Sequence, residues 1–522
     1  MGNAESSQYT RSAPANQRIA CLLNGYRHNS NSCYSKGFSQ VSLLNRNHTL
    51  GGFTSNIKTI YWPETRTLMA LALPICGAQL AQAGMSVVDV IMTGRHNATD
   101  LAAVSVGSSL WMPLMLFMTG TLMGLTPIVA HLLGGKRNTD IRPAVHQALW
   151  VALVLGCIAA ALLWTVVTPI FELMKVPPAV ARESAAYLSA VAFGMPGIAL
   201  FQALRAFSDG MNHTRPALWI SLVGLAVNIP SNYLLIYGGD GLVNLFGAAI
   251  VPSGLQQLPA LGAFGCGIAT ALSMWTMAVA MALYTRKGRT YRSVSLWQKL
   301  TPPKLSGIRE LVVVGVPIGV AIFVEVTLFT LIALFIASFG EVTVGAHQIA
   351  LSFTTILFML PMSLSMALTV RVGNTLGQQR FAMARTVAWN GIVISVIVAV
   401  FNSTLLWFTA VPVISLYTSN ADIQALALTI ISLAVLFQLS DSLQVNLAGA
   451  LRGYKDTRIV MVITVLSYWI VGLGGGHWLG THGIGNLSQP MGVHGYWIGL
   501  IAGLSTAALL LAWRLTRISQ QE

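Results

Sequence analysis

Residues Thr67–Pro74 read TLMALALP and residues Glu310–Pro317 read ELVVVGVP, so the second stretch follows the first at an offset of 243 (317 minus 74). The same offset, with no gap, aligns LGGKR at 133–137 with LGQQR at 376–380. It also pairs Gly210, Thr214 and Arg215 with Gly453, Thr457 and Arg458. Three separated matches at one spacing predict two repeated units, over 63–285 and 306–522, joined by a linker over 286–305.

Each unit contains six long apolar segments. In the first unit we expect membrane spans at 66–93, 101–130, 143–171, 181–207, 214–238 and 262–285. In the second unit we expect them at 306–338, 343–372, 383–410, 423–450, 457–480 and 492–515. A helix of about twenty apolar residues crosses the hydrocarbon core of a bilayer. Because six is even, both units begin on the same side, so the repeats are parallel. The predicted fold is an all-α polytopic membrane protein with twelve transmembrane helices in two six-helix lobes.

The composition excludes a water-soluble protein. Of the 522 residues, 54% are hydrophobic and 9% are charged, whereas a soluble globular chain carries about 25% charged residues. The segment 1–62 differs because it is polar and rich in Asn and Ser, so we expect a disordered cytoplasmic extension there. The linker 286–305 is basic and contains Pro302 and Pro303, which predicts a hinge-like cytoplasmic connection.

The net charge of +14 lies mainly in connections on one side of the predicted membrane domain. The alternate connections contain only Arg95, Lys175 and Arg182 as basic residues. This asymmetry follows the positive-inside rule and predicts that both termini are cytoplasmic. We therefore expect a multi-pass protein of the cell inner membrane, in contact with the lipid bilayer. No cluster interleaves basic with aromatic residues, so nucleic acid is not an expected partner.

The motifs of ATP-driven pumps and of hydrolases are missing from the sequence. It contains no GxxxxGKS/T loop, no HExxH and no GxSxG, and its five cysteines form no CxxC pair. The chain is therefore not expected to be an enzyme or to hold a cofactor. The energy for any active transport would come from an ion gradient.

Three carboxylates lie deep inside the apolar spans, at Asp89, Glu325 and Asp441. An ionised carboxylate at the centre of a bilayer costs about 2.5 to 3.5 kcal/mol on insertion scales, so such residues usually serve an ion or substrate pathway. We expect all three to bind a coupling cation or a cationic substrate. Asp89 lies nearer a helix end than the others, and an interfacial position is the alternative for it.

The sequence predicts that polar residues lie near Asp89. Gln82 and Ser86 precede it by seven and three residues, which places all three on one helical face. The fifth span offers Asn228 and Asn232, four residues apart. Carboxylate and amide oxygens are hard ligands of the kind that an alkali cation needs, and the amides could also donate hydrogen bonds to the carboxylate. The alternative is that the asparagines only pack helices, at about 1 kcal/mol each.

The second unit has a different set of polar residues. Gln438 and Gln444 lie three residues on either side of Asp441 and share its helical face. Glu325 lies in the apolar run IFVEV, and the offset of 243 pairs it with Gln82. The two units are therefore not chemical copies of each other.

Two prolines occupy equivalent positions in the two units, at Pro74 and Pro317. A proline inside a helix removes one hydrogen bond and bends the helix, and membrane proteins tolerate this where neighbours or a cavity satisfy the freed carbonyl. Pro74 could therefore support movement near Asp89, or it could only shape the helix. We interpret the lone His347 as a packing residue.

Five motifs, in this order and at this spacing, resemble one known family. They are VVDVIMTG at 87–94, NIPSNY at 228–233, EVTLF at 325–329, AHQ at 346–348 and LRGYKD at 451–456. Over about 65–515 the chain resembles the NorM branch of the multidrug and toxic compound extrusion (MATE) family. Each motif alone is weak, but the series is specific.

The resemblance implies a twelve-helix, two-lobe exporter that exchanges toxic organic cations for sodium ions or protons. It implies that the N-lobe carboxylate is Asp89, held near Asn228 and Asn232. It further implies that Glu325 and Asp441 form a cation site in the C-lobe, so that a sodium ion is expected at one or both groups. We expect the protein to act as a monomer.

The sequence departs from the family pattern at two places. A tyrosine that contributes to the C-lobe site in some members is Phe437 here, so the ring face is available to a cation but the hydroxyl is not. The segment between Gly238 and Gly262 is longer than is typical of the family.

Other function classes remain open from the sequence alone. A flippase for lipid-linked precursors or polysaccharides from the same superfamily would favour a strongly cationic cavity. We interpret the intramembrane ionisable residues as all acidic, which favours a cationic cargo. A multi-pass membrane enzyme or a passive channel is the alternative from a different class, and gradient-driven movement of substrate in liposomes would exclude both.

Overall fold

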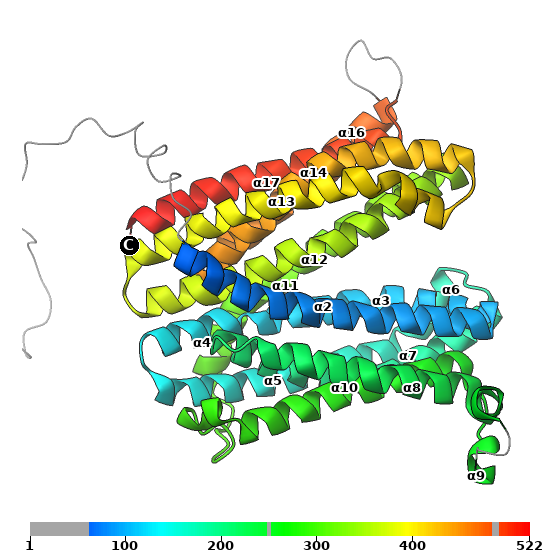
Figure 1. The fold of residues 1–522 in the computed structure, drawn as a ribbon, viewed down its shortest axis with the longest axis horizontal. Helices are drawn as coiled ribbons and strands as arrows, with labels where there is room; N and C mark the ends of the chain where they lie inside the picture. The colour runs from blue at the N-terminus through cyan, green and yellow to red at the C-terminus, as the bar shows by residue number, and fades with distance from the viewer. Residues whose placement is uncertain (1–61, 248–251, 483–489, 522) are drawn as a thin grey trace, which may run out of the picture. The chain divides into compact units, whose positions relative to one another are not determined.

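The computed structural model describes residues 62–247, 252–482 and 490–521. The expected disordered extension therefore lies outside the described residues, apart from Trp62. Within them every regular element is helical, and 12 helices are long and apolar enough to cross a membrane. The prediction of an all-α protein with twelve spans is confirmed (Figure 1).

The helices of the two lobes follow the predicted order. The N-lobe contains α2 (Trp62–His96), α3 (Ala98–Met123), α4 (Leu125–Gly134), α5 (Asn138–Thr165), α6 (Val167–Leu173), α7 (Pro178–Gly210), α8 (Arg215–Phe246), the short α9 (Ser253–Gln256) and α10 (Gly262–Lys287). The C-lobe contains α11 (Leu305–Ile336), η2 (Ala337–Phe339), α12 (Glu341–Gly377), α13 (Phe381–Tyr417), α14 (Ala421–Gly453), α15 (Thr457–Leu466), η3 (Ser467–Gly474), α16 (Gly475–His482) and α17 (Val493–Gln521).

Most helices are longer than their apolar segments, because hydropathy detects only the part that crosses the hydrocarbon. The fifth span was expected to end at 238, but α8 continues to Phe246. The helix is kinked at Gly238, where the backbone is not helical. The φ of Gly238 is 65°, in the left-handed region where a residue with a Cβ is strained. Part of the long segment after Gly238 is therefore helical. In the C-lobe, the glycine-rich run after α15 forms the π-helical η3.

The turns on the basic side repeat as the sequence does. Lys136 and Gln379 have φ of 57° and 58°, and they are 243 residues apart. Asn212 and Lys455, also 243 residues apart, have φ of 62° and 59°. Left-handed backbone is uncommon for residues with side chains, so the matching turns are strong evidence for the repeat. We call the face formed by these turns the basic face.

Glycines bring the lobes into close contact toward the basic face. A Cβ on Gly120 would lie 2.8 Å from the Cα of Gly319, and one on Gly124 would lie 2.6 Å from the Cα of Gly315. The α3 and α11 backbones therefore touch with no room for side chains. Nearby, Arg371 on α12 binds both carboxylate oxygens of Glu64 on α2, at 2.6 and 2.7 Å, where the two helices lie side by side (Figure 1).

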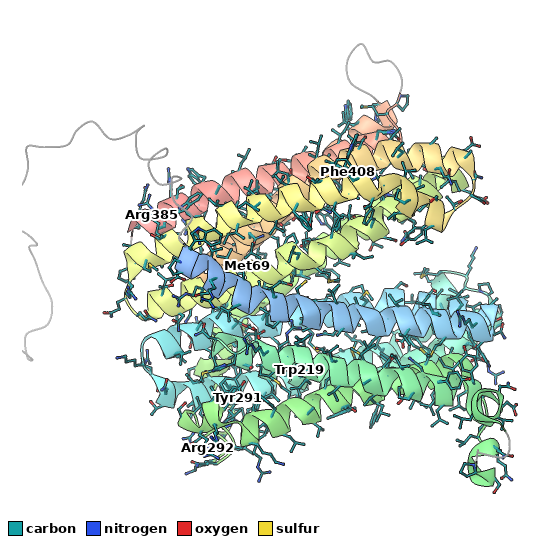
Figure 2. The ribbon with its side chains drawn as sticks, viewed as in Figure 1. Met69, Trp219, Tyr291, Arg292, Arg385 and Phe408 are labelled. Atoms are coloured by element: carbon teal, nitrogen blue, oxygen red, sulfur yellow. The ribbon has the colours of Figure 1, made fainter. Side chains whose placement is uncertain are left out.

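The linker packs along the N-lobe instead of hanging free. Tyr291 in η1 (Arg289–Ser293) is buried, and its hydroxyl lies 2.6 Å from the Ser208 hydroxyl on α7. Burial raises the pKa of Tyr291 to about 12. His146 on α5 contacts the carbonyl of Leu296 at 2.8 Å. In Figure 2, Tyr291 turns inward among the N-lobe helices while Arg292 points outward. The expected hinge is therefore a docked segment of the N-lobe.

Candidate functional site

Asp89 is buried inside the N-lobe at the meeting point of three helices. It lies on α2 and is 5% exposed. Asn228 and Asn232 on α8 both donate to its Oδ1, at 3.2 and 2.5 Å. Thr270 on α10 donates to its Oδ2 at 3.1 Å. The interfacial alternative for Asp89 therefore does not describe this structure, and the two predicted asparagines are brought to the carboxylate.

Every partner of the Asp89 carboxylate is a neutral group. In the described part of the chain no Lys, Arg or His forms an ion pair with it. A buried charge without an opposite charge is costly, and such a carboxylate takes up a proton or binds a cation. The amide oxygen of Asn232 is buried without a hydrogen-bond donor. It would complete a small oxygen-lined site for either species.

The other predicted neighbours of Asp89 lie apart from this cluster. Gln82 donates to Ser221 on α8 at 3.2 Å, so it links α2 to α8 at a position separate from the Asp89 cluster. Ser86 makes no hydrogen bond to Asp89 in the described structure. Pro74 lies in the first half of α2.

In the C-lobe, Glu325 on α11 and Asp441 on α14 lie close enough for their charges to interact. Asp441 is 3% exposed and Glu325 is half-buried. Neither carboxylate forms an ion pair or a hydrogen bond within the described ranges. Two neighbouring carboxylates in an apolar lobe cannot both stay ionised at low cost. A proton on either carboxylate, or a bound cation, would relieve their repulsion.

The predicted neighbours of Asp441 differ in their packing. Gln438 is fully buried, and neither its amide nitrogen nor its oxygen has a hydrogen-bond partner among the described residues. The Gln444 amide oxygen is also buried without a partner. Phe437 packs against Phe329 and Trp497, with ring centroids 6.2 and 5.7 Å apart. Its ring is thus part of an aromatic wall, while the two glutamines offer unused oxygens.

Comparisons with known proteins agree with this architecture. The MatE family model matches residues 74–234 and 317–477, two ranges whose starts and ends both differ by 243. The chain is 40% identical over 458 residues to the multidrug resistance protein PmpM of Pseudomonas aeruginosa, covering 88% of this chain and 92% of that one.

This chain belongs to the MATE family.

Solved MATE structures share the fold. A eukaryotic MATE transporter, AtDTX14, superposes with a TM-score of 0.76 at 20% identity, covering 89% of this chain and 99% of that one. The Vibrio cholerae MATE transporter VcmN in its bent form superposes with a TM-score of 0.74 at 16% identity, with the same coverage. The family is one of transporters, so the expectation of a transporter instead of an enzyme is confirmed.

The expectation that the intramembrane ionisable residues are all acidic is wrong. Arg205 and Asp209 on α7 and Arg452 on α14 are all buried. Arg205 lies 3.7 Å from Asp209 and donates to Gln79 at 3.1 Å. Arg205 fell inside a predicted span, and its spacing of four residues from Asp209 was the signal for a helical ion pair. Asp209 and Arg452 were missed because the expected spans ended before them.

In this MATE chain, Asp209 and Arg452 occupy equivalent positions, since 452 minus 209 is 243. They face the same small cavity, of about 10 Å³, where the lobes meet. Methionine, threonine and apolar residues of both lobes form the rest of its wall. The repeat thus places an acidic residue in one lobe and a basic residue at the equivalent position of the other lobe. Both lie beside the contact between the lobes. The charge of Arg452 also acts on Glu325.

Three further residues at the sites lie on helices for which the sequence predicted no site residue. Thr270 and Cys266 on α10 both contact the Asp89 carboxylate. Tyr468 in η3 is 1% exposed, its hydroxyl has no hydrogen-bond partner, and the charges of Glu325 and Asp441 act on it. None of these residues is unusual for its span, so only the spatial arrangement identifies them.

Each MATE lobe builds its site from positions that the other lobe fills with different chemistry. At the equivalents of Asp89, Asn228 and Asn232, the C-lobe has Ile332, Val471 and Gly475. At the equivalents of Asp441 and Tyr468, the N-lobe has Ile198 and Leu225. The two lobes therefore have the same helix order, but each has an acidic site of its own.

Proposed function

We propose that this MATE transporter exports organic cations from the cytoplasm in exchange for inward movement of sodium ions or protons. Its similarity to a protein named for multidrug resistance supports multidrug efflux as the biological role. We further propose that it works in the cell inner membrane with both termini in the cytoplasm, since its basic turns lie on one face. We propose the monomer as the working unit.

The observation that carries this proposal is the buried Asp89 carboxylate with only neutral donors around it. Such a group is stable when it holds a proton or a monovalent cation, and it must release that ion for the lobe to return. Two hydrogen bonds to Oδ1 and one to Oδ2 fix the carboxylate orientation. The N-lobe site is therefore suited to take up a coupling ion.

The C-lobe supplies a second acidic site with an aromatic wall. Glu325 and Asp441 attract a cation, and the aromatic wall of Phe437, Phe329 and Trp497 lies in the same lobe. We propose that this pair binds substrate or a coupling sodium ion, and that it exchanges one for the other. A site built from charge and apolar surface discriminates poorly among lipophilic monocations.

Drug accumulation in cells tests the cargo. Expression in a host that lacks its own efflux pumps should lower accumulation of ethidium-like dyes and of cationic fluoroquinolones. A strain that expresses Asp89→Asn at the same membrane level is the matched control and should accumulate dye as the empty host does. Unchanged accumulation with the wild-type protein present in the membrane would refute export of organic cations.

The flippase of the same superfamily stays the second candidate because Arg205 and Arg452 are buried near the lobe contact. Arg205 is balanced by Asp209, and Arg452 acts on Glu325, so neither makes a strongly cationic cavity. A fluorescent lipid-linked pyrophosphate that crosses liposomes containing the protein faster than protein-free liposomes would favour the flippase.

A further inference from the structure

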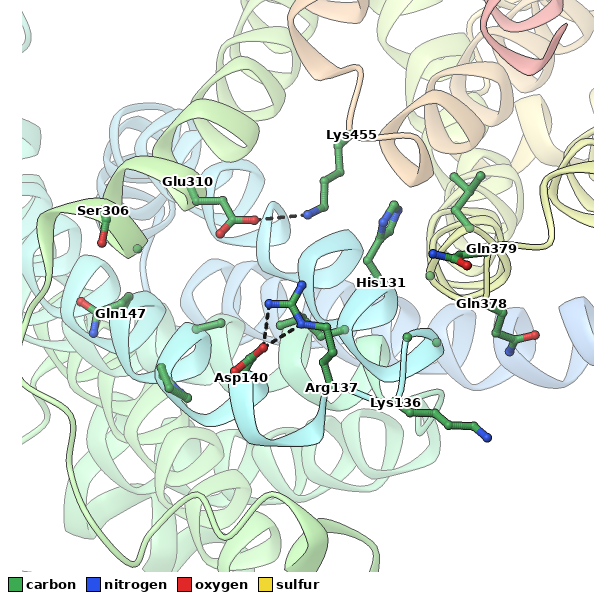
Figure 3. Close-up of a pocket in the computed structure, with 18 of the residues that line it drawn as sticks. His131, Lys136, Arg137, Asp140, Gln147, Ser306, Glu310, Gln378, Gln379 and Lys455 are labelled. Carbon is green, nitrogen blue, oxygen red and sulfur yellow. Dashed lines mark hydrogen bonds and ion pairs between the residues drawn. The ribbon is translucent and has the colours of Figure 1, made fainter. Parts of the chain in front are cut away.

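A hollow of about 960 Å³ opens on the basic face between the lobes (Figure 3). One wall is the turn between α4 and α5, with Lys136 and Arg137, and the opposite wall is the equivalent turn between α12 and α13, with Gln378 and Gln379. Lys455, at the turn after α14, faces it from the C-lobe. Ligand pockets of small molecules span about 300 to 1,000 Å³, so the hollow can hold a whole lipid headgroup.

The charge of the lining is positive. Four cationic side chains and two carboxylates line the hollow, an excess of two positive charges (four minus two). They are Lys136, Arg137, Lys304 and Lys455, with Asp140 and Glu310. Arg137 pairs with Asp140 at 2.7 Å and Lys455 pairs with Glu310 at 3.2 Å. Exposed pairs of this kind contribute about 0 to 1 kcal/mol, so an incoming anion can compete for both cations.

Lys136 and Lys304 have no carboxylate partner among the residues that the structure describes. Both side chains are exposed at the rim of the hollow. Lys136 also has left-handed backbone, as do Gln379 and Lys455 on the other walls. This conformation belongs to the repeated turns that end the helices, because Asn212 shares it and does not line the hollow. The two lysines without a carboxylate partner are what distinguish the hollow from the rest of the basic face.

The hollow also has an apolar edge. Leu132, Leu376 and Phe381 line it, and the Phe381 ring is 41% exposed. A free inorganic anion would gain nothing from this edge, whereas a lipid has an acyl chain beside its phosphate. Basic pockets between transmembrane helices at the cytoplasmic side bind the headgroups of anionic lipids.

We propose that this hollow binds the phosphate headgroup of an anionic phospholipid. Lys136 and Lys304 contact the phosphate, Arg137 and Lys455 exchange their carboxylates for it, and the first acyl carbons lie along Leu132 and Phe381. Because the walls come from both lobes, the lipid stabilises the arrangement in which the two turns are in contact. The site is independent of the acidic sites and of the nature of the coupling ion.

The test uses the full chain purified in neutral detergent micelles and titrated with phosphatidylglycerol, with bound lipids counted by native mass spectrometry. The double variant Lys136→Gln and Lys304→Gln should bind the tightest lipid about twenty-five-fold more weakly, from about a factor of five for each lysine. The matched control removes two exposed lysines of the linker region that do not line the hollow, by Lys287→Gln and Lys299→Gln. It should bind the lipid as the wild type does.

Thermal unfolding in the same micelles provides a second readout. Phosphatidylglycerol should raise the melting temperature of the wild type and of the control, but not of the Lys136/Lys304 variant. Equal weakening in the control and the test variant would show only general attraction to a basic face and would overturn the proposal. In a parallel arm, inorganic phosphate is titrated by calorimetry. If phosphate binds through Lys136 and Lys304 and the lipid does not, the occupant is a free anion and the lipid assignment is wrong.

Discussion

At the scale of single residues, Asp89 and its three donors define the most selective environment in the N-lobe. The carboxylate accepts from Asn228, Asn232 and Thr270 and lies beside Cys266. All these contacts hold the carboxylate in place, but none neutralises it. A buried carboxylate in these surroundings takes up a proton or binds a cation.

The substitution Asp89→Asn tests this role. An asparagine keeps the size of the side chain and some of its hydrogen bonds but cannot take up a proton or bind a cation as a carboxylate does. We expect folded protein at the wild-type level and the loss of gradient-driven efflux, measured as dye export from cells. Asp140→Asn, at an exposed ion pair on the basic face, is the control and should export normally.

The C-lobe carboxylates are tested by Glu325→Gln and Asp441→Asn. Each change removes one of two like charges that repel each other, so the Asp441→Asn protein should be at least as stable as the wild type. Glu325→Gln also removes the attraction between Glu325 and Arg452, so its stability should stay close to that of the wild type. Export should fall by tenfold or more in both variants, in the same assay of dye export from cells. Glu341→Gln, at the exposed first turn of α12, is the control. Two variants that both export at the wild-type rate would remove the C-lobe site from the mechanism.

At the scale of helices, the sequence predicted the spans and the two asparagines beside Asp89, but not the other partners at each site. Gln82, Ser86 and Asp89 share a face by periodicity, yet Gln82 bonds to Ser221 instead of joining the cluster. Periodicity gives the face of one helix, whereas contacts between helices depend on their tilt and order in the lobe. For the same reason Thr270 and Tyr468 could not be predicted, because nothing in their own spans marks them.

Helix ends were the other source of error. Asp209 and Arg452 lie just past the expected ends of their spans, where hydropathy falls although the helix continues. The linker was expected as a hinge because it is basic and contains two prolines, but Tyr291 and Leu296 are buried against the N-lobe. The large aromatic and aliphatic residues within this basic segment, Tyr291 and Leu296, were the signal that the linker packs on the N-lobe.

Docking of the linker predicts a measurable contribution to stability. Tyr291→Ala removes a buried ring and its hydrogen bond to Ser208, which should cost about 3 to 5 kcal/mol by analogy with other buried aromatic truncations. The melting temperature of the purified protein should fall clearly. Arg292→Ala, one residue away and exposed, should leave it unchanged. Equal melting temperatures for the two variants would mean that the linker is not docked in the membrane protein.

The contact between α3 and α11 predicts a second effect at this scale. A Cβ on Gly315 would collide with the Thr121 carbonyl, and overpacking of this kind costs about 1 to 3 kcal/mol. Gly315→Ala should therefore weaken closure at the basic face. The readout is a cysteine placed at the buried Thr369, beside the small cavity of Asp209 and Arg452. This cysteine should react with a water-soluble maleimide severalfold faster in the Gly315→Ala protein than in the protein that keeps Gly315.

The control for this experiment is Gly475→Ala, because a Cβ on Gly475 meets no atom within 4 Å. Both substitutions are made in a background without other cysteines. Labelling rates that stay the same in Gly315→Ala would show that the lobes do not separate at this contact.

At the scale of the whole molecule, the repeat explains both the fold and the division of labour. The offset found in the sequence recurs in the turns, in the family match and in the pair formed by Asp209 and Arg452. The fold class followed from the sequence because repetition and hydropathy persist over hundreds of residues. The chemical difference between the lobes also followed in part from the sequence, since the offset pairs Glu325 with Gln82.

The energetics of exchange constrain how the whole protein works. Moving a monovalent cation out against a negative interior costs about 2.3 kcal/mol per 100 mV, and one proton or sodium ion moving inward releases the same amount. One-for-one exchange is therefore electrically neutral, and the concentration gradient of the coupling ion drives it. Two acidic sites in one chain suit such an exchange, because ion and cargo can occupy different lobes.

The most direct measurement is uphill transport of a cationic dye in proteoliposomes, with a sodium gradient and a proton gradient imposed in separate experiments. The proposed function predicts that at least one gradient drives dye against its own concentration gradient with the wild type, and that Asp89→Asn abolishes this movement. Dye that only equilibrates under both gradients, or gradient-driven transport that is unchanged in Asp89→Asn, would contradict ion-coupled export through the N-lobe carboxylate.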